Sequence, residues 1–179
     1  LPVGDSILYE KEADHRIAPF NPVLEFQIIG VEDDEGVTSD DTFEMDTVSI
    51  GDIYYGRLVA ENVYGPEGYT LKMPFQAEYW DGNRFSVNKG DDNCTTWSTA
   101  GINNPQNYHT MEAGSGKFEQ GQGGPLELTG TGEGSDTLSW KDRWWWADFD
   151  GNGSVDPPTA TATFGVYRGN DRIIYWQEV

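Results

Sequence analysis

The chain is poor in the side chains on which many catalytic and cross-linked folds depend. Its 179 residues include one cysteine, Cys94, and two histidines, His15 and His109. A lone cysteine cannot form a disulfide within the chain, so Cys94 is either a buried thiol or half of a bridge to a partner outside this sequence. Neither histidine stands in a metal-ligand spacing or beside a nucleophile motif, which leaves zinc chemistry and a Ser-His-Asp triad poorly supported.

Other catalytic arrangements find little more support. Carboxylates are so abundant that any pair of them is a weak signal for glycoside hydrolysis. Cys94 as a nucleophile would need a general base to which the sequence does not point. We therefore predict that the protein is not an enzyme.

Positive charge and long apolar runs are also scarce. Eleven Lys and Arg residues face 31 Asp and Glu residues, for a formal net charge of −20. This charge repels nucleic acid and anionic membranes and suits salt water or an exterior rich in divalent cations. There is no apolar run near 18 residues and no signal peptide, and the chain opens at Leu1 without Met. We expect no nucleic-acid binding, no membrane insertion, and a piece cut from a longer precursor.

Helical runs rich in Ala and Leu are missing, whereas glycine (22 residues) and aromatic residues (13%) are plentiful. This balance favours strands and turns. Alternation of apolar and polar residues predicts strands over residues 23–31, 54–63 and 71–80, a turn at 81–83 into residues 85–87, and a C-terminal hairpin over 160–178. The sequence thus predicts one all-β domain over residues 1–179, an antiparallel two-sheet β-sandwich with long loops, in which residues 1–22 form a lead-in strand and linker.

The predicted core follows the apolar faces of these strands. Pro74 cannot donate to a strand ladder, so it predicts an edge strand or a bulge. Residues 89–136, rich in Gly, Asn, Asp, Thr and Ser, are expected to be mostly loops with short β-prone pieces such as 125–129. The acidic run from residue 32 is read as a solvated turn rather than a second cation site. The core is predicted to contain Leu24, Phe26, Ile28, Leu58, Leu71, Met73, Phe75, Tyr79, Phe164, Val166, Ile173 and Tyr175.

One stretch has a spacing that suggests chemistry. Residues 148–156 carry oxygen-bearing side chains at positions 1, 3, 5 and 9 of a D-x-D-x-N-G-x-x-D pattern, with Gly153 at position 6 and the Ser154 carbonyl available at position 7. This is the first part of an EF-hand-type Ca²⁺ loop. Position 12, usually a bidentate Glu, is Thr159, and no helical pattern flanks the loop. The candidate Ca²⁺ ligands are Asp148, Asp150, Asn152, Ser154 and Asp156; the alternative is a solvated Asp/Asn/Gly turn.

Aromatic residues close to this loop offer a second kind of site. Trp144, Trp145 and Trp146 precede it, and Trp97 and Tyr108 lie in the predicted loop region. In a strand of three tryptophans the middle ring would point away from the outer two, so part of the set would be exposed. Exposed aromatic rings can stack on sugar rings, which makes a carbohydrate-binding module the alternative function. Burial of these rings in the core is the competing interpretation.

Four segments carry a resemblance to a known family. They read GRL at 56–58 with NVYG at 62–65, QAEYWDG at 76–82, DDNCT at 91–95, and ATATFGVYRGNDRIIY at 160–175. Together they resemble the C-terminal domain of MshQ-type proteins, which are encoded with the mannose-sensitive haemagglutinin (MSHA) type IV pilus machinery of Gram-negative bacteria. The resemblance runs from about Phe20 to the end of the chain.

The resemblance implies a setting rather than a reaction. It implies the terminal module of a secreted, pilus-associated protein at the cell surface or in the Gram-negative envelope, whose partners are other domains of its own precursor and pilus components. Together with the Ca²⁺ loop, it leads us to expect a non-catalytic, calcium-stabilised extracellular module of an adhesin-like surface protein. A glycan is the possible ligand under the alternative function.

Overall fold

The structure is a computed structural model, and it describes residues 11–12, 15–25, 27–44 and 47–165. Within that part of the chain all regular structure is strand, apart from two 3-10 helices of one turn each. The elements are β1 (Val23–Leu24), β2 (Gln27–Glu32), β3 (Thr38–Glu44), β4 (Val48–Ser49), β5 (Gly56–Ala60), β6 (Val63–Gly65), β7 (Thr70–Trp80), β8 (Phe85–Val87), β9 (Thr96–Ser98), η1 (Thr99–Gly101), β10 (Ile102–Asn103), β11 (His109–Met111), β12 (Ser115–Lys117), β13 (Gln122–Gly130), β14 (Gly134–Trp140), η2 (Arg143–Trp145) and β15 (Thr159–Phe164).

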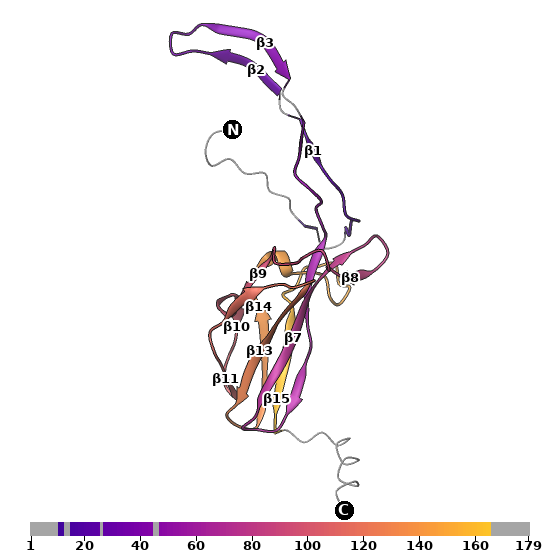
Figure 1. Ribbon diagram of the computed structural model, residues 1–179, viewed down its shortest axis with the longest axis vertical. Coiled ribbons are helices and arrows are strands. Elements are labelled where there is room, and N and C mark those ends of the chain that lie inside the picture. Colours follow the sequence, from indigo (N-terminus) through magenta and orange to yellow (C-terminus); the bar gives the residue numbers. More distant parts are fainter. Residues whose placement is uncertain (1–10, 13–14, 26, 45–46, 166–179) are drawn as a thin grey trace, which may run out of the picture.

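Two sheets form the body of the molecule (Figure 1). One has the strand order β10-β14-β15-β6. The other has the order β11-β13-β7-β5, and β8 also pairs with the end of β7. Neighbouring strands are antiparallel except β15 and β6, which pair in parallel. The predicted all-β, antiparallel sandwich is confirmed.

The core lies between these sheets because their inward-facing positions are apolar. On β7 the alternation buries Met73, Phe75 and Ala77, and on β15 it buries Ala160, Ala162 and Phe164 in the same apolar cluster. The four predicted core residues Leu58, Met73, Phe75 and Phe164 are buried. Leu71 is half-buried against the core, and Tyr79 is half-buried. The placement of Phe26, Val166, Ile173 and Tyr175, and with it most of the second strand of the predicted C-terminal hairpin, lies outside the described residues.

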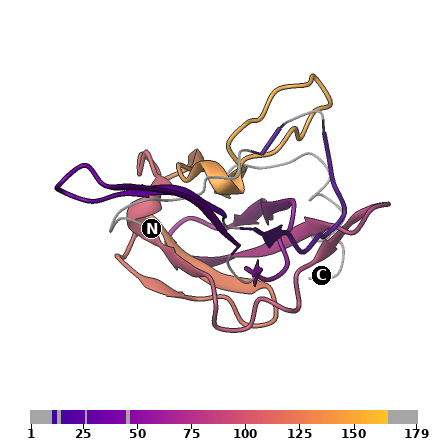
Figure 2. The same cartoon turned by 90° about the horizontal axis from the view of Figure 1, so that it is seen from above.

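Residues 20–53 form an arm that leaves the sandwich (Figures 1 and 2). At its root Phe20 and Ile53 exchange two backbone hydrogen bonds, of 3.2 and 2.8 Å. Beyond the root, and within the described part of the chain, β1 pairs only with β4 and β2 only with β3. The prediction that Leu24 belongs to the sandwich core is therefore wrong, and the strand expected over residues 23–31 is split into β1 and β2. Ile28 lies on β2 and pairs with Phe43, also outside the sandwich.

The expectation that residues 89–136 are mostly loops with short β-prone pieces is only partly right, because the region also contains the long strand β13 and the start of β14. β13 lies inside the five-stranded sheet between β11 and β7, and β14 lies inside the other sheet. β13 contains Gly123 and Gly124, whose missing side chains admit the Phe75 ring: a Cβ at either position would lie within 2.5 Å of that ring. These glycines, which read as loop in sequence, are thus required by close packing.

Pro74 is in an interior strand, so the edge position proposed for it is wrong, but the bulge is present. β13 is bulged between Gly123 and Leu126, opposite Phe75 and Met73. On the other side β5 ends at Ala60, opposite Phe75, and the Pro74 carbonyl accepts a hydrogen bond from Glu61 N at 3.1 Å. The ladder therefore needs no donor from Pro74.

Candidate functional site

The predicted Ca²⁺ loop is closed at its neck by a β-bridge. Ala147 and Asp156 pair across it, with Ala147 N donating to Asp156 O at 3.2 Å and Asp156 N donating to Ala147 O at 2.9 Å. The bridge pairs the residue just before the first position with the ninth position of the pattern. Thr159, at the twelfth position, is already the first residue of β15. Figure 2 shows the loop after η2 standing out from one side of the sandwich.

Asp148 organises this loop through its carboxylate. Its Oδ1 accepts hydrogen bonds from Gly151 N at 2.6 Å and Asn152 N at 3.2 Å, and its Oδ2 accepts one from Gly153 N at 3.2 Å. Burial by itself would raise the pKa of Asp148, but these three amides and the positive charge of Arg16 together hold it below its usual value. The side chain is therefore an anion at neutral pH, with the loop backbone wrapped around it.

Carboxylate and amide oxygens are the ligands that a hard divalent cation prefers, and the loop brings several of them close together. Asn152 N donates to Asp148 Oδ1 and, at 3.1 Å, to Asp150 Oδ1, so both carboxylates face one backbone nitrogen. The Asn152 side chain donates to Asp150 Oδ2 at 3.0 Å and accepts from Ser154 N at 2.8 Å. Asp148, Asp150 and Asn152 thus share a single turn.

The fifth predicted ligand, Asp156, lies at the neck of the loop. Asp156 lines a groove together with Asp150. Among the described residues no group of three or more His, Cys, Asp or Glu side chains is gathered as a metal cage. A Ca²⁺ ion here would take Asp148, Asp150 and the Asn152 oxygen as its first protein ligands, and the Ser154 carbonyl, Asp156 or water would complete its coordination.

The three consecutive tryptophans lie in and just after η2 rather than in a strand. Trp145 is buried in the core at 7% exposure, whereas Trp144 is 64% exposed. Trp146 is half-buried, and its Nε1 donates to Trp140 O at 3.0 Å. The turn thus sends one ring inward and one into solvent, beside the Asp148 loop.

The other two aromatic candidates lie elsewhere. Trp97 packs edge-on against Phe75 at a centroid distance of 5.4 Å, and its indole nitrogen is buried without a hydrogen-bond partner among the described residues. Tyr108 is 38% exposed at the other end of the sandwich, against Gly134. The five aromatic candidates therefore do not form one surface, and only Trp144 combines high exposure with closeness to the loop.

Cys94 is exposed, so a buried thiol is excluded; its Sγ lies 3.8 Å from Asp92 O. The described part of the chain contains no helix long and apolar enough to cross a membrane.

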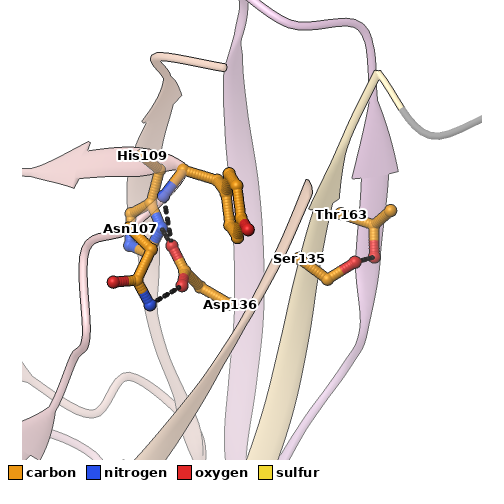
Figure 3. Close-up of polar contacts among 6 residues, drawn as sticks. Asn107, His109, Ser135, Asp136 and Thr163 are labelled. Atoms are coloured by element: carbon orange, nitrogen blue, oxygen red, sulfur yellow. Dashed lines mark hydrogen bonds and ion pairs between the residues drawn. The ribbon is translucent and has the colours of Figure 1, made fainter. Parts of the chain in front are cut away.

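A buried polar network that sequence reasoning missed links the two sheets. His109 Nδ1 lies 2.8 Å from Asp136 Oδ2, and both side chains are fully buried. Tyr108 N donates to the same oxygen at 2.8 Å, and Asn107 Nδ2 donates to Oδ1 at 2.9 Å (Figure 3). The carboxylate thus gathers three donors, and the His109 ring stacks on Phe164. Asp136 lies 27 to 29 positions after its three partners in the sequence. No local spacing motif could have predicted these contacts.

A joint of cationic and aromatic side chains attaches the residues before the arm to the sandwich. The guanidinium groups of Arg16 and Arg57 both lie over the Phe85 ring, at 5.5 and 3.7 Å from its centroid. Lys11 Nζ donates to Gly56 O at 2.7 Å and Trp144 O at 3.1 Å. Burial lowers the pKa of Lys11 to about 8. These contacts hold Lys11 and Arg16 against β5, β8 and η2.

Comparison with known proteins identifies a family for this chain. A family model described as "DUF6701, fourth domain" matches residues 54–179. No curated protein and no solved structure matches the chain. The matched range begins directly after Ile53, the residue that closes the root of the arm, so the sandwich and the family domain start at the same place. The chain therefore belongs to the DUF6701 family, whose fourth domain, of uncharacterised function, its residues 54–179 match.

Proposed function

We propose that the protein is a non-catalytic, calcium-stabilised extracellular module of a pilus-associated, adhesin-like surface protein. The proposal rests on one turn of the loop. In it the carboxylates of Asp148 and Asp150 both accept a hydrogen bond from the backbone nitrogen of Asn152. Two carboxylates so placed, in a chain of net charge −20, repel each other unless a cation lies near them. A Ca²⁺ ion there would act as a structural clamp between η2 and β15.

The setting rests on the resemblance of four segments to MshQ-type proteins and on the charge of the chain. Two of these segments, at 56–65 and 76–82, contribute β5, β6 and the end of β7 to the two sheets. A strongly acidic surface suits an exterior rich in divalent cations and gives no support to nucleic-acid binding. On this basis the partners are other domains of the same precursor and components of the pilus.

The non-catalytic part of the proposal has its support in the placement of the His–carboxylate pair that the described residues contain, His109 and Asp136. His109 and Asp136 have the geometry of a base and its orienting group, but neither side chain is exposed. A substrate would have to unpack Phe164 to reach His109. We read this pair as a structural link between the sheets.

A calcium titration of thermal stability tests the proposal. The loop lacks the twelfth-position Glu, so we expect a Kd of roughly 10⁻⁴ to 10⁻³ M. At ~10 mM calcium the stabilisation is then at least about 1.4 kcal/mol, or a rise in Tm of roughly 3–6 °C for a chain of this size. The double variant Asp148→Asn, Asp150→Asn should lose this rise.

Asp81→Asn is the matched control. Asp81 also sits in a turn and accepts hydrogen bonds from two backbone amides, Asn83 N and Arg84 N, both at 2.9 Å. The control variant should keep the full calcium response, because it loses only a turn-capping carboxylate. Equal melting temperatures of the wild-type protein in excess EDTA and in calcium would show that residues 148–156 are only a solvated turn.

Carbohydrate binding is the second candidate, and the exposure of Trp144 favours it. An indole ring that is 64% exposed next to a possible cation site is a surface on which a sugar ring can stack. A glycan array with and without EDTA tests this function. Calcium-dependent hits that disappear in Trp144→Ala would establish it, and an empty array would leave the structural module.

A further inference from the structure

A groove of about 380 Å³ lies on the side of the sandwich where β10 and β11 run along the edges of the two sheets (Figure 1). Residues 104–108 connect these two strands. The walls of the groove come from η1, β10, this connection, the end of β11 and Lys141 at the end of β14. None of the lining residues belongs to the loop at residues 148–156, so the groove is a separate place on the molecule.

One side chain of the groove, Asn104, has an amide whose hydrogen-bonding groups are unused. Its Oδ1 and its Nδ2 are both covered by surrounding atoms, and neither has a hydrogen-bond partner among the described residues. Such an amide can donate two hydrogen bonds and accept two. Buried polar groups in folded proteins are nearly always paired, so an unpaired amide beside a groove favours a role in binding over a role in folding.

Other polar groups of the groove are used within the fold. The Thr99 hydroxyl donates to Gly114 O at 3.1 Å and accepts from Gly114 N at 2.9 Å. Lys141 Nζ donates to Ala100 O at 3.2 Å and keeps two further N–H groups for another acceptor. The Asn104 amide, by contrast, can rotate into the groove without breaking a hydrogen bond to the described part of the chain.

The rest of the lining suits a small uncharged ligand. Ala100, Ile102, Met111 and Ala113 give the groove apolar walls, and its lining contains no Asp or Glu. A volume of a few hundred Å³, with apolar walls and a few polar groups, is typical of sites for small molecules. A net charge of −20 repels anions, so a neutral ligand rich in hydroxyl groups fits better than a carboxylate or a phosphate.

We propose that this groove binds a neutral sugar ring through two adjacent hydroxyl groups. Asn104 turns into the groove, where its Oδ1 accepts a hydrogen bond from one hydroxyl and its Nδ2 donates one to the next. Lys141 donates to a further ring oxygen, and the C–H face of the ring packs on Met111 and Ala113. The site requires neither Ca²⁺ nor Trp144, so this proposal and the two candidate functions above can fail independently.

An NMR titration of the isotope-labelled full chain in excess EDTA tests the proposal, with D-glucose, D-galactose and D-mannose as probes. For at least one sugar we expect saturable amide shifts at residues 99–113 and 141, with a Kd of about 1–10 mM. Tetrahydropyran-2-methanol, a ring of the same size with a single hydroxyl group, should bind at least about tenfold more weakly, because it cannot pair with both groups of the amide.

The variant Asn104→Leu removes both polar groups of the amide at nearly constant volume. Because these groups make no hydrogen bond within the described chain, its Tm should lie no more than about 2 °C below that of the wild type. Sugar affinity should nevertheless fall at least about tenfold. Asn83→Leu is the matched control: Asn83 is exposed in the turn before β8, and its replacement should leave sugar affinity unchanged.

Three results would overturn the proposal. One is the absence of saturable shifts with all three sugars, which would leave only water in the groove. The second is sugar binding that persists in Asn104→Leu. The third is a failure to fold of both Asn104→Leu and Asn104→Ala, which adds no bulk, because that result would assign the amide to the fold.

Discussion

Asp136 and His109 form a hydrogen bond across the interior of the sandwich, from β14 in one sheet to β11 in the other, with 2.8 Å between Oδ2 and Nδ1. Both side chains are fully buried. The carboxylate accepts two further hydrogen bonds, from Tyr108 N and Asn107 Nδ2, and so fixes the start of β11 against the facing sheet. A buried charge held in this way stabilises the fold only while all of its donors are in place.

Asp136→Asn should destabilise the protein by about 3 kcal/mol, because the amide removes the charge and turns an NH₂ group toward donors. Urea unfolding measures the difference. Glu127→Gln is the control: Glu127 makes only an exposed ion pair with Lys72, at 3.5 Å, and its loss should change stability by no more than about 0.5 kcal/mol. Equal losses of unfolding free energy in the two variants would show that the buried network stabilises the fold no more than an exposed ion pair does.

The contribution of Asp136 should disappear in acid. Burial by itself would raise the pKa of Asp136, but the hydrogen bonds from Tyr108, Asn107 and His109 and the charge of His109 lower it below its ordinary value. A depressed folded-state pKa gives stability that is complete above the unfolded value, about 3.9, and is lost as the pH falls through the folded value. The stability gap between wild type and Asp136→Asn should therefore be constant from pH 7 to about 5 and close below pH 4. A gap that persists at pH 2 would contradict this assignment.

The arm should be dispensable for folding of the sandwich. Phe20 and Ile53 are already paired at its root, so residues 21–52 can be replaced by a short Gly/Asn turn with little loop-closure cost. The deleted residues contain ten Asp and Glu and no Lys, Arg or His, so the net charge falls from −20 to −10 and self-repulsion decreases. We expect a cooperative melt at or slightly above the wild-type Tm. Insoluble protein would show that the arm belongs to the folding unit.

Docking of the segment before the arm should strengthen with rising pH. Burial lowers the pKa of Lys11 from 10.5 to about 8, so the docked state favours the neutral amine, whose two N–H groups still match the Gly56 and Trp144 carbonyls. The docked state therefore gains stability between about pH 8 and 10.5 and lacks that gain below pH 8. Hydrogen-exchange protection around Tyr55, corrected for the base-catalysed rise in intrinsic exchange, should increase over this range. Lys11→Met keeps the apolar stem and should abolish the pH dependence.

By itself the sequence determined the strand class of this protein and its clearest local features. Alternation along residues 71–80 and from residue 160 identified β7 and β15, because alternate apolar side chains of each strand pack into the core. Asp81 identified the turn into β8. The spacing at residues 148–156 located a loop in which Asp148, Asp150 and Asn152 do lie on one turn. Such features depend on contacts within a few residues, which a local pattern records.

The tertiary structure decided what covers each face. Residues 23–31 alternate as a core strand does, yet among the described residues their strands pair with partners inside the arm. Gly123 and Gly124 read as loop, yet they lie in an interior strand where the Phe75 ring occupies the space of their side chains. The His109–Asp136 link and the burial of Trp145 beside exposed Trp144 depend on which strands and turns meet across the sandwich. A local pattern shows which residues need cover but not which distant segment provides it, because that choice depends on register and on packing between the sheets.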